Sequence, residues 1–468
     1  MDKFFKITEH GSTVKTEIIA GFTTFFAMAY IIFVNPNQVT GFTEGLSNIW
    51  NAVYVASILA ATIGTLLMAL YAKMPFAQAC GMGLNSFFFV SFILPQVIAG
   101  GDCVQGYQAG LVIVLISGII FMILSLTGAR QYIAKAMPEC LKKAIPAGIG
   151  LFITYIGFQN VGIIQANQYT LTQFVDIHGA INGEGGIMTV LPALLALLGF
   201  LLIVILGKRN VKGNVLIGII ITAVLYYVFS GTVPSFDITQ IGQSFKDFAD
   251  IGVTGVFQSA SWKHAFSPEF VGGVFSAILY IITFCLIDMF DTIGTLYGTA
   301  AQADLLDENG DPQNLDKCMA CDSIATVSGA VLGTSTCTTF VESASGVAAG
   351  GRTGLTSLVV SICFFVCLFL TPLASIVPAC ATAPALIYVG VLMLGNFKNV
   401  DMSDLSSAAP AFLTLIAMPL TYSIANGIGI GSIAYTIIAI CTGKFQKKDI
   451  MVAIIGLLFC LKFIFITM

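Results

Sequence analysis

The chain has 468 residues, of which only 9% are charged, whereas about a quarter are charged in typical soluble domains. With 57% hydrophobic residues and a mean hydropathy of +0.93, it holds more apolar side chains than three ordinary globular cores could bury. The net charge of −4 leaves no basic stripe that could neutralise phosphates, which argues against a nucleic-acid partner. The composition therefore predicts an all-α polytopic protein of the lipid bilayer.

Apolar stretches long enough to form membrane segments recur along the whole chain. Seven are expected in the first half, at residues 18–34, 52–71, 82–98, 109–127, 144–158, 188–207 and 215–229. After a polar connection, seven more are expected at residues 271–293, 319–332, 338–350, 355–370, 383–397, 408–422 and 428–442. The first stretch is longer than the apolar region of a typical signal peptide, so we interpret it as an uncleaved membrane segment.

Two halves of seven segments must have opposite orientations, as in the inverted repeats of many transporters. Pro146 in the fifth segment and Pro384 in the twelfth both precede a glycine by eleven residues, which is a weak internal resemblance in the correct register. The pattern predicts a first repeat at residues 1–230, a connection at 231–267, a second repeat at 268–443 and a C-terminal region at 444–468. Residues 449–468 either cross the membrane or lie along its inner surface.

Basic residues predict the orientation, because short cytoplasmic loops collect Lys and Arg. Residues 161–187, on the expected outer side, contain neither. Basic residues instead occur before the first segment and in loops on the expected inner side, among them Lys3, Lys6, Lys15, Lys208, Arg209, Lys212, Lys444, Lys447 and Lys448. We therefore expect a multi-pass protein of the cell membrane with a cytoplasmic N-terminus.

The third and tenth segments are short and interrupted by glycines and polar residues, including Gly83, Asn85 and Glu342. Such residues at membrane depth break a helix and leave backbone groups that must line a cavity or be buried in protein. Corresponding broken segments in two halves are a pointer to a transporter's binding site. Close packing through small residues is the alternative. It does not explain Glu342, since a carboxylate at the centre of a span costs about 2.5 to 3.5 kcal/mol.

The eighth segment contains Asp288 and Asp291, whose i, i+3 spacing predicts that both lie on one helical face. When two carboxylates lie close together in a low dielectric, their repulsion favours a state in which one of them carries a proton. The alternative is a hydrated pair that caps the end of the helix. Asp322 lies near the start of the ninth segment, where acids are usually solvated or capping, and it is left outside the predicted site.

The sequence gives little support to metal, cofactor or enzyme chemistry. Cys318 and Cys321 form a single CxxC without partners, and the three His residues lie in loops, so we expect no metal site and no cofactor. Ser343 follows Glu342 but has no His near it in the sequence, which leaves no nucleophile–base pair. A channel is disfavoured because channels commonly use symmetric rings, whereas this chain carries two unlike broken segments.

Four motifs in chain order resemble those of AzgA-like purine permeases, in the nucleobase and ascorbate transporter superfamily. They are Glu17-Ile18-Ile19-Ala20-Gly21-Phe22-Thr23-Thr24-Phe25 with Val34-Asn35-Pro36, Gly81-Met82-Gly83-Leu84-Asn85-Ser86-Phe87-Phe88, Asp288-x-x-Asp291-Thr292-Ile293-Gly294-Thr295, and Thr338-Thr339-Phe340-Val341-Glu342-Ser343. The resemblance is nearly end to end. Cys80 stands where the family more often has Pro.

The resemblance implies fourteen segments in two inverted repeats, with segments 1–4 and 8–11 forming a core domain and 5–7 and 12–14 a gate domain. It implies proton symport of hypoxanthine and guanine, or of adenine, and leaves open whether the homodimer common in the wider superfamily forms here. Asn85, Asp291, Glu342, Gly83 and Thr339 would bind the substrate, and Glu342, Asp291 and Asp288 would couple protons. Carboxylates suit the ring N–H donors of a purine, and Tyr30, Phe87 and Phe88 are candidate stacking faces, although aromatic residues more often pack. An anion transporter or a uracil or xanthine transporter of the same fold is the alternative.

Overall fold

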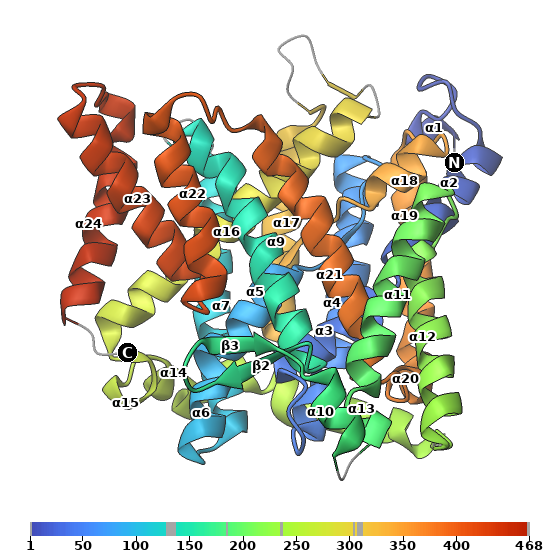
Figure 1. The fold of residues 1–468 in the computed structure, drawn as a ribbon. Coiled ribbons are helices and arrows are strands. Elements are labelled where there is room, and N and C mark those ends of the chain that lie inside the picture. Colours follow the sequence, from blue (N-terminus) through green and yellow to red (C-terminus); the bar gives the residue numbers. More distant parts are fainter. Residues whose placement is uncertain are drawn as a thin grey trace.

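The computed structural model describes residues 2–127, 137–183, 186–234, 237–302, 305–306 and 312–465. These residues are mostly helical, and ten of their helices are long and apolar enough to cross a membrane (Figure 1). Two shorter apolar helices are found at Asn214–Ser230 and Leu405–Leu420. The expected helical, polytopic membrane fold is confirmed.

The first half of the chain contains α1 (Asp2–Phe5), α2 (Val14–Met28), α3 (Ile31–Thr40), α4 (Ser47–Leu67), β1 (Gln78–Cys80), α5 (Met82–Phe88), α6 (Leu94–Ala99), α7 (Cys103–Thr127), α9 (Glu139–Asn160), β2 (Ile164–Asn167), β3 (Leu171–Phe174), α10 (Ile177–Asn182), α11 (Leu191–Lys208) and α12 (Asn214–Ser230). The second half contains α13 (Thr239–Asp247), α14 (Ser259–Ala265), α15 (Pro268–Val271), α16 (Val274–Gln302), α17 (Leu315–Leu332), β4 (Cys337–Thr339), α18 (Ser343–Ala348), α19 (Gly354–Val366), α20 (Thr371–Ala374), α21 (Ala379–Leu394), α22 (Leu405–Leu420), α23 (Ile424–Cys441) and α24 (Ile450–Phe465). Short turns of other helix types join or extend these elements, including η1 (Met68–Ala72), η2 (Phe89–Ile93) and η4 (Phe248–Val253).

The first expected segment is two joined helices, because the α-helix is interrupted at Ala29 and Tyr30 between α2 and α3. Pro36 lies inside α3, six residues after Tyr30. Proline lacks a backbone N–H and its ring clashes with the carbonyl of the preceding turn, so it weakens the helix there. The break turns the buried side chain of Tyr30 toward the tenth segment, as described below.

The helices pack in two groups. Helices α2, α4, α7, α17 and α19 pack against one another in the first group. In the second, α9 packs against α21 and α22, α11 and α12 pack against α21, and α22 packs against α23. Each group thus draws helices from both halves of the chain. Helix α16, which packs on α7 of the first group, contacts α9 of the second, and so does α5.

Glycines allow close approaches within each group, which matters because lipid tails are as apolar as helix side chains and close packing must hold the helices together. A Cβ atom at Gly346 of α18 would lie 2.0 Å from Thr24 Oγ1 of α2. A Cβ atom at Gly390 of α21 would lie 1.9 Å from Thr154 Oγ1 of α9. Any larger side chain at either position would push two helices apart.

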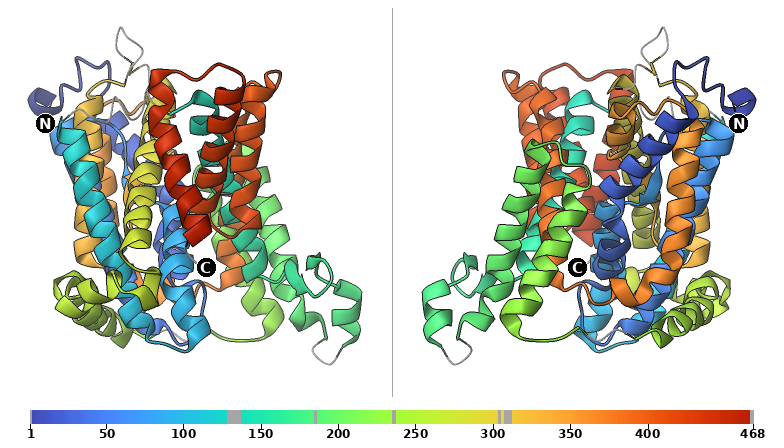
Figure 2. Two further views of the ribbon diagram at one scale, coloured as in Figure 1. Left: turned by 90° about the vertical axis from the view of Figure 1, so that its left-hand side faces the viewer. Right: turned by 90° about the vertical axis from the view of Figure 1, so that its right-hand side faces the viewer.

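Four short strands depart from the purely helical expectation. Strands β2 and β3 form a hairpin that projects, with α10, from the end of the molecule opposite the N-terminus (Figures 1 and 2). It lies within residues 161–187, which lack Lys and Arg. The other two strands, β1 and β4, belong to the broken third and tenth segments.

The last apolar helix, α24, lies lengthwise beside α23 and also contacts α16 (Figure 1). Lys462 of α24 is buried, and its Nζ is 5.4 Å from the ring centre of Tyr280 on α16. A cation–π contact of this kind is favourable for a buried ammonium group.

Candidate functional site

The broken third and tenth segments meet as an antiparallel pair of strands. Strand β1 pairs with β4 in the register Gln78 to Thr339 and Cys80 to Cys337. Beyond the strands, Gly81 N donates to Thr336 O at 3.0 Å, and Phe340 N donates to Ala77 O at 2.9 Å. The pairing satisfies the backbone groups that the two broken helices leave free at membrane depth.

Each strand leads directly into a short helix, α5 after β1 and α18 after β4. Gly81 is the N-terminal cap residue of α5, and Glu342 is that of α18. The hydroxyl of Ser343 accepts a hydrogen bond from Ala77 N at 3.0 Å, which fixes the start of α18 to the strand before α5. The two broken segments are therefore joined at these antiparallel strands.

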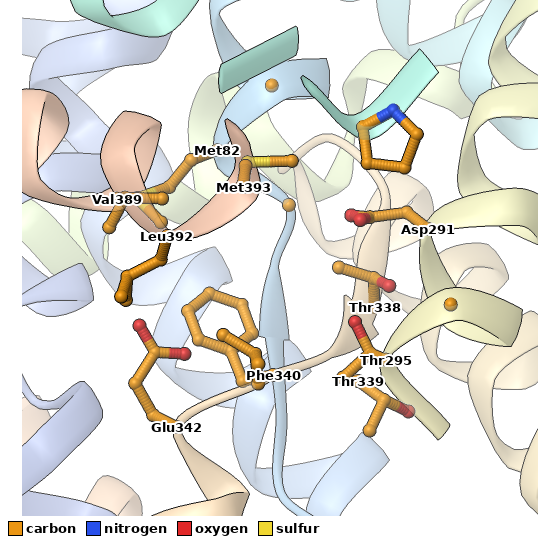
Figure 3. A pocket seen from close by; sticks show the side chains of 15 residues that line it. Met82, Asp291, Thr295, Thr338, Thr339, Phe340, Glu342, Val389, Leu392 and Met393 are labelled. Carbon is orange, nitrogen blue, oxygen red and sulfur yellow. The ribbon is translucent and has the colours of Figure 1, made fainter. Parts of the chain in front are cut away.

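A cavity of about 250 Å³ lies beside this strand pair, a little below the roughly 300 to 1,000 Å³ of pockets for drug-sized ligands. Its lining comes from the start of α5, from β4 and the residues after it, from α16, and from the facing helices α9 and α21: Gly81, Met82, Gly83, Pro146, Asp291, Gly294, Thr295, Thr338, Thr339, Phe340, Val341, Glu342, Val389, Leu392 and Met393. In Figure 3, Asp291 and Glu342 enter it from different sides, with Thr338 next to Asp291. The cavity thus lies between the two groups of helices and combines apolar walls with two carboxylates.

Glu342 is oriented by Tyr30. The Tyr30 hydroxyl donates to Glu342 Oε1 at 2.6 Å, and the Tyr30 side chain is fully buried. A hydrogen bond between a hydroxyl and an ionised carboxylate is short and strong. Tyr30 was a candidate stacking residue in the sequence, but here its hydroxyl holds one carboxylate oxygen of Glu342.

Asp288 and Asp291 of α16 separate, although their spacing predicted a shared face. Asp291 lines the cavity. Asp288 is buried and accepts a hydrogen bond from Thr326 Oγ1 of α17 at 2.7 Å, while its Oδ1 has no partner among the described residues. Residues three apart differ by about 60° around a helix axis, which is enough to turn one carboxylate toward the cavity and the other toward α17.

Asn85 lies behind the cavity rather than in its lining. Its amide nitrogen donates to Asn35 Oδ1, and its amide oxygen accepts from Ser335 Oγ. Asn35 continues the network toward Ser57 and Thr334. The amide of Asn85 therefore links α5 to α3 and to the loop before β4, and in this geometry both of its polar atoms are engaged with protein groups.

Gly83 and Thr339 both line the cavity, as Asp291 and Glu342 do. A Cβ atom at Gly83 would lie 2.3 Å from Cγ2 of Ile149 on α9, so glycine permits α5 and α9 to approach each other. The hydroxyl of Thr339 lies 3.4 Å from Oδ1 of Asp322. The structure thus brings four of the six predicted residues to one cavity and leaves Asn85 and Asp288 outside its lining.

Three residues of this region were not predicted as part of the site. Tyr30 was considered only for stacking, Thr338 only as part of a motif, and Asp322 was set aside as a helix-end acid. Asp322 is fully buried and accepts hydrogen bonds from Thr292 Oγ1 at 2.5 Å and from Gln78 Nε2 at 3.1 Å. The position of Asp322 is explained by the observed start of α17 at Leu315, which places this acid inside the helix and not at its end.

Within the described part of the chain, no group of three or more His, Cys, Asp and Glu residues is placed to hold a metal ion. The arrangement offers instead carboxylates and hydroxyls that face a small cavity. Carboxylates accept hydrogen bonds or take up protons, and hydroxyls both donate and accept. The site is therefore suited to bind a small polar molecule by its edge.

Comparison with known proteins gives long matches. The chain is 43% identical to the guanine/hypoxanthine permease PbuG of Bacillus subtilis over 473 aligned residues, which cover 100% of both chains. It is 37% identical to the adenine permease AdeQ of Escherichia coli, covering 100% of this chain and 96% of that protein. Among solved structures, the transmembrane domain of the cyanobacterial bicarbonate transporter BicA superposes with a TM-score of 0.59 at 15% identity, covering 88% of this chain and 96% of that one.

The similarity to BicA at 15% identity concerns the fold alone. The family model described as "Permease family" (Xan_ur_permease) matches residues 15–430, which is most of the chain and includes both broken segments. Together with the end-to-end relatives, this match agrees with the resemblance found in the four motifs. The chain is a multi-pass membrane transporter that belongs to this permease family and resembles its AzgA-like purine permeases.

Proposed function

We propose that this protein imports purine nucleobases, hypoxanthine and guanine or adenine, together with protons. The observation that carries the proposal is the pair of carboxylates, Asp291 and Glu342, on one small cavity between the two groups of helices. End-to-end relatives named as guanine/hypoxanthine and adenine permeases support the substrate class.

Asp291 and Glu342 are proposed to accept hydrogen bonds from the N–H groups on the edge of the purine. Thr339 can donate or accept beside them, and Gly83 lets α5 approach α9 at the wall of the cavity. Asp288 is proposed to take part in proton coupling from its buried position. Asn85 contributes to substrate preference through the network that holds α5 in place.

The charge of the cavity argues against the anion alternative. The residues of its described lining include two acids and no Lys or Arg. An anion placed a few ångströms from two carboxylates in a low dielectric would be strongly repelled. A neutral base with N–H donors meets no such repulsion.

The proposal includes alternating access between a core and a gate. Fourteen segments in two inverted repeats, residues 1–230 and 268–443 with the connection 231–267, would supply a core from segments 1–4 and 8–11 and a gate from segments 5–7 and 12–14. The cavity lies where α16 and β4 of the proposed core face α9 and α21 of the proposed gate, which supports this division. Movement of one group against the other would then open the cavity to alternate sides.

We further propose that the protein lies in the cell membrane with its N-terminus in the cytoplasm. The basic loops of α11–α12 and of α23–α24 lie at the same end of the molecule as the N-terminus, and the β2–β3 hairpin lies at the other (Figure 1). Homodimer formation and a membrane crossing by residues 449–468 are further parts of the proposal. Cross-linking in membranes and labelling of a cysteine introduced after α24 test these two parts.

The experiment is uptake of radiolabelled hypoxanthine by cells that lack their own purine permeases. Unlabelled guanine, adenine, xanthine, uracil and bicarbonate serve as competitors. We expect competition by purines, and loss of accumulation when a protonophore collapses the pH gradient. Competition by bicarbonate or uracil but not by purines would refute the substrate class. Loss of uptake on removal of sodium, with no effect of the protonophore, would refute the coupling ion.

A further inference from the structure

A buried carboxylate outside the cavity lining, that of Asp322, is connected to the cavity by hydroxyl groups. Asp322 of α17 is fully buried, and it is not part of the cavity lining. Its Oδ2 accepts a hydrogen bond from Thr292 Oγ1 at 2.5 Å. Thr292 Oγ1 is in turn 2.8 Å from the hydroxyl oxygen of Thr338, and Thr338 lines the cavity. Two hydroxyls thus connect the cavity to Asp322 without a gap.

The order of donors in this connection is not fixed by the positions of the oxygens. Each hydroxyl carries one hydrogen and accepts through its lone pairs, so a row of hydroxyls can point all its hydrogens one way or all the other way. When Asp322 is ionised, Thr292 must donate to it and Thr338 donates to Thr292. The oxygen of Thr338 then faces the cavity as an acceptor.

We propose that Asp322 receives the transported proton through Thr338 and Thr292, and that its protonation reverses the hydrogen bond that Thr338 offers to the ligand. A proton from the cavity binds Thr338 Oγ1, whose own hydrogen passes to Thr292 Oγ1, whose hydrogen passes to Asp322 Oδ2. No bond to carbon changes, and one positive charge is transferred. Afterwards Asp322 donates to Thr292, Thr292 donates to Thr338, and Thr338 donates into the cavity.

This inference rests on the proposed function and adds a residue to it. It makes ligand recognition depend on the proton, since a hydroxyl that accepts from a ring N–H in one state donates to a ring nitrogen or carbonyl in the other. Binding in one state and release in the other is what coupling of two fluxes requires.

Among the described residues, the titratable groups near Asp322 leave it without a positive partner. Asp288 and Asp291 lie on the adjacent α16, and the thiols of Cys80 and Cys337 lie on β1 and β4. Helices α4 and α7, which also pack on α17, contain no acidic or basic residue. On α17 itself, Cys321 is buried, Asp316 lies in the first turn and Lys317 is exposed. Asp250 of η4, which also packs on α17, is exposed as well. Neutral donors alone satisfy Asp322, so its charge is free to be cancelled by a proton.

Asp288, also proposed above for proton coupling, is the other buried acid close to this route, but the geometry favours Asp322 as the acid that a proton reaches from the cavity. The partner of Asp288 is Thr326, whose hydroxyl also lies 2.9 Å from Cys337 O and accepts from Cys337 N at 3.1 Å. That route ends at backbone groups of β4. The route from Asp322 ends at the side-chain hydroxyl of Thr338 in the cavity. Thr339 also lines the cavity, but its hydroxyl lies 3.4 Å from Asp322 Oδ1, beyond the usual length of an O–H···O hydrogen bond.

The test replaces Thr292 by valine, which has nearly the same shape but no hydroxyl, and by serine, which keeps the hydroxyl. The purified protein is reconstituted in liposomes with a pH-sensitive dye. Exchange of labelled for unlabelled hypoxanthine at equal pH reports binding and movement of the carrier. Accumulation driven by an inside-alkaline pH gradient, and acidification of the lumen, report coupling. The matched control is Thr283→Val, since Thr283 is a buried threonine of the same helix that bonds only its own backbone at Leu279 O.

We expect Thr292→Val to keep exchange and lose both accumulation and proton entry, while Thr292→Ser and Thr283→Val keep all three. Accumulation and proton entry by Thr292→Val at the wild-type level would overturn the proposal, as would loss of exchange in a well-folded Thr292→Val protein. Where Thr292→Val does not fold, Asp322→Asn decides by the same criteria, because an amide cannot store the proton. Absence of hypoxanthine exchange in the wild-type protein would refute the proposed function instead.

Discussion

The hydrogen bond from Tyr30 to Glu342 gives the most direct test of the proposed binding site. Tyr30→Phe removes one hydroxyl from a fully buried side chain and leaves the ring in place. A hydrogen bond to a charged group contributes about 1.5 to 3 kcal/mol, which corresponds to a roughly 10- to 150-fold change in binding. Glu342 borders the cavity, where water can replace part of the lost bond, so we expect the lower end of that range, about tenfold weaker binding of hypoxanthine.

The assay is equilibrium binding of labelled hypoxanthine to the purified protein. Tyr54→Phe is the matched control, because Tyr54 is also fully buried and lies outside the cavity lining. Its hydroxyl donates to the backbone oxygen of Cys367 at 2.7 Å. We expect the control to lower stability and leave the dissociation constant unchanged. A double variant, Tyr30→Phe with Glu342→Gln, measures the coupling. If Tyr30 acts through Glu342, adding Tyr30→Phe to Glu342→Gln weakens binding little further.

Two outcomes would contradict this reasoning. A wild-type dissociation constant for a well-folded Tyr30→Phe protein would mean that Glu342 does not need its partner, or does not bind the ligand. Additive effects of the two changes would mean that Tyr30 acts on binding by a route other than Glu342.

Three further predictions concern Asp291, Asn85 and Glu17. Asp291→Asn keeps size and removes the charge, so we expect loss of hypoxanthine uptake at normal abundance in membrane blots; uptake and affinity near wild type would make Asp291 structural. Asn85→Ser replaces an amide whose nitrogen and oxygen both form hydrogen bonds. If the variant is present at normal abundance and a different set of purines competes for uptake, Asn85 has a role in substrate preference. Low abundance with an unchanged set of competitors supports a structural role. Glu17→Ala removes a fully buried carboxylate that accepts from Arg352 N at 2.9 Å and Thr356 Oγ1 at 2.6 Å, so we expect a loss of about 3 kcal/mol in unfolding free energy in mixed micelles. The exposed Glu9→Ala, which breaks only a surface pair with Lys6, should change it by less than about 1 kcal/mol; equal effects would contradict the assigned role of Glu17.

The parts of the fold that follow from local pattern could be predicted from the sequence. Runs of apolar residues located the long helices, although α7 begins six residues before its expected start and α16 ends nine residues after its expected end. The glycines near Gly83 and Gly350 identified the two broken segments. The strands β1 and β4 could not be predicted, because each is three residues long and exists only through pairing with the other across more than 250 positions. A local pattern contains no information about such a partner.

The candidate site shows the same division. Glu342 and Asp291 were recognisable because an acid within an apolar run is costly and needs a reason. Asp322 was missed because the predicted ninth segment began at residue 319, which made the acid a helix-end residue, whereas α17 begins a turn earlier at Leu315. The direction of Asp288 depended on a rotation of about 60° around α16, which spacing alone does not resolve.

The way in which this chain satisfies its buried acids bears on how it could use protons. Glu17 is held by backbone N–H groups and a threonine hydroxyl, Glu342 by Tyr30, Asp288 by Thr326, and Asp322 by Thr292 and Gln78. The ion pairs that the described residues form with Lys are instead on the surface, as with Lys142 and Glu139. A buried Lys or Arg beside an acid would hold it ionised through the whole cycle, because its removal from the pair leaves an uncompensated charge. Hydroxyls and amides tolerate both protonation states, since a hydroxyl that donates to a carboxylate can accept from a carboxylic acid. A membrane carrier whose interior acids are paired in this way can change their charge without breaking its fold.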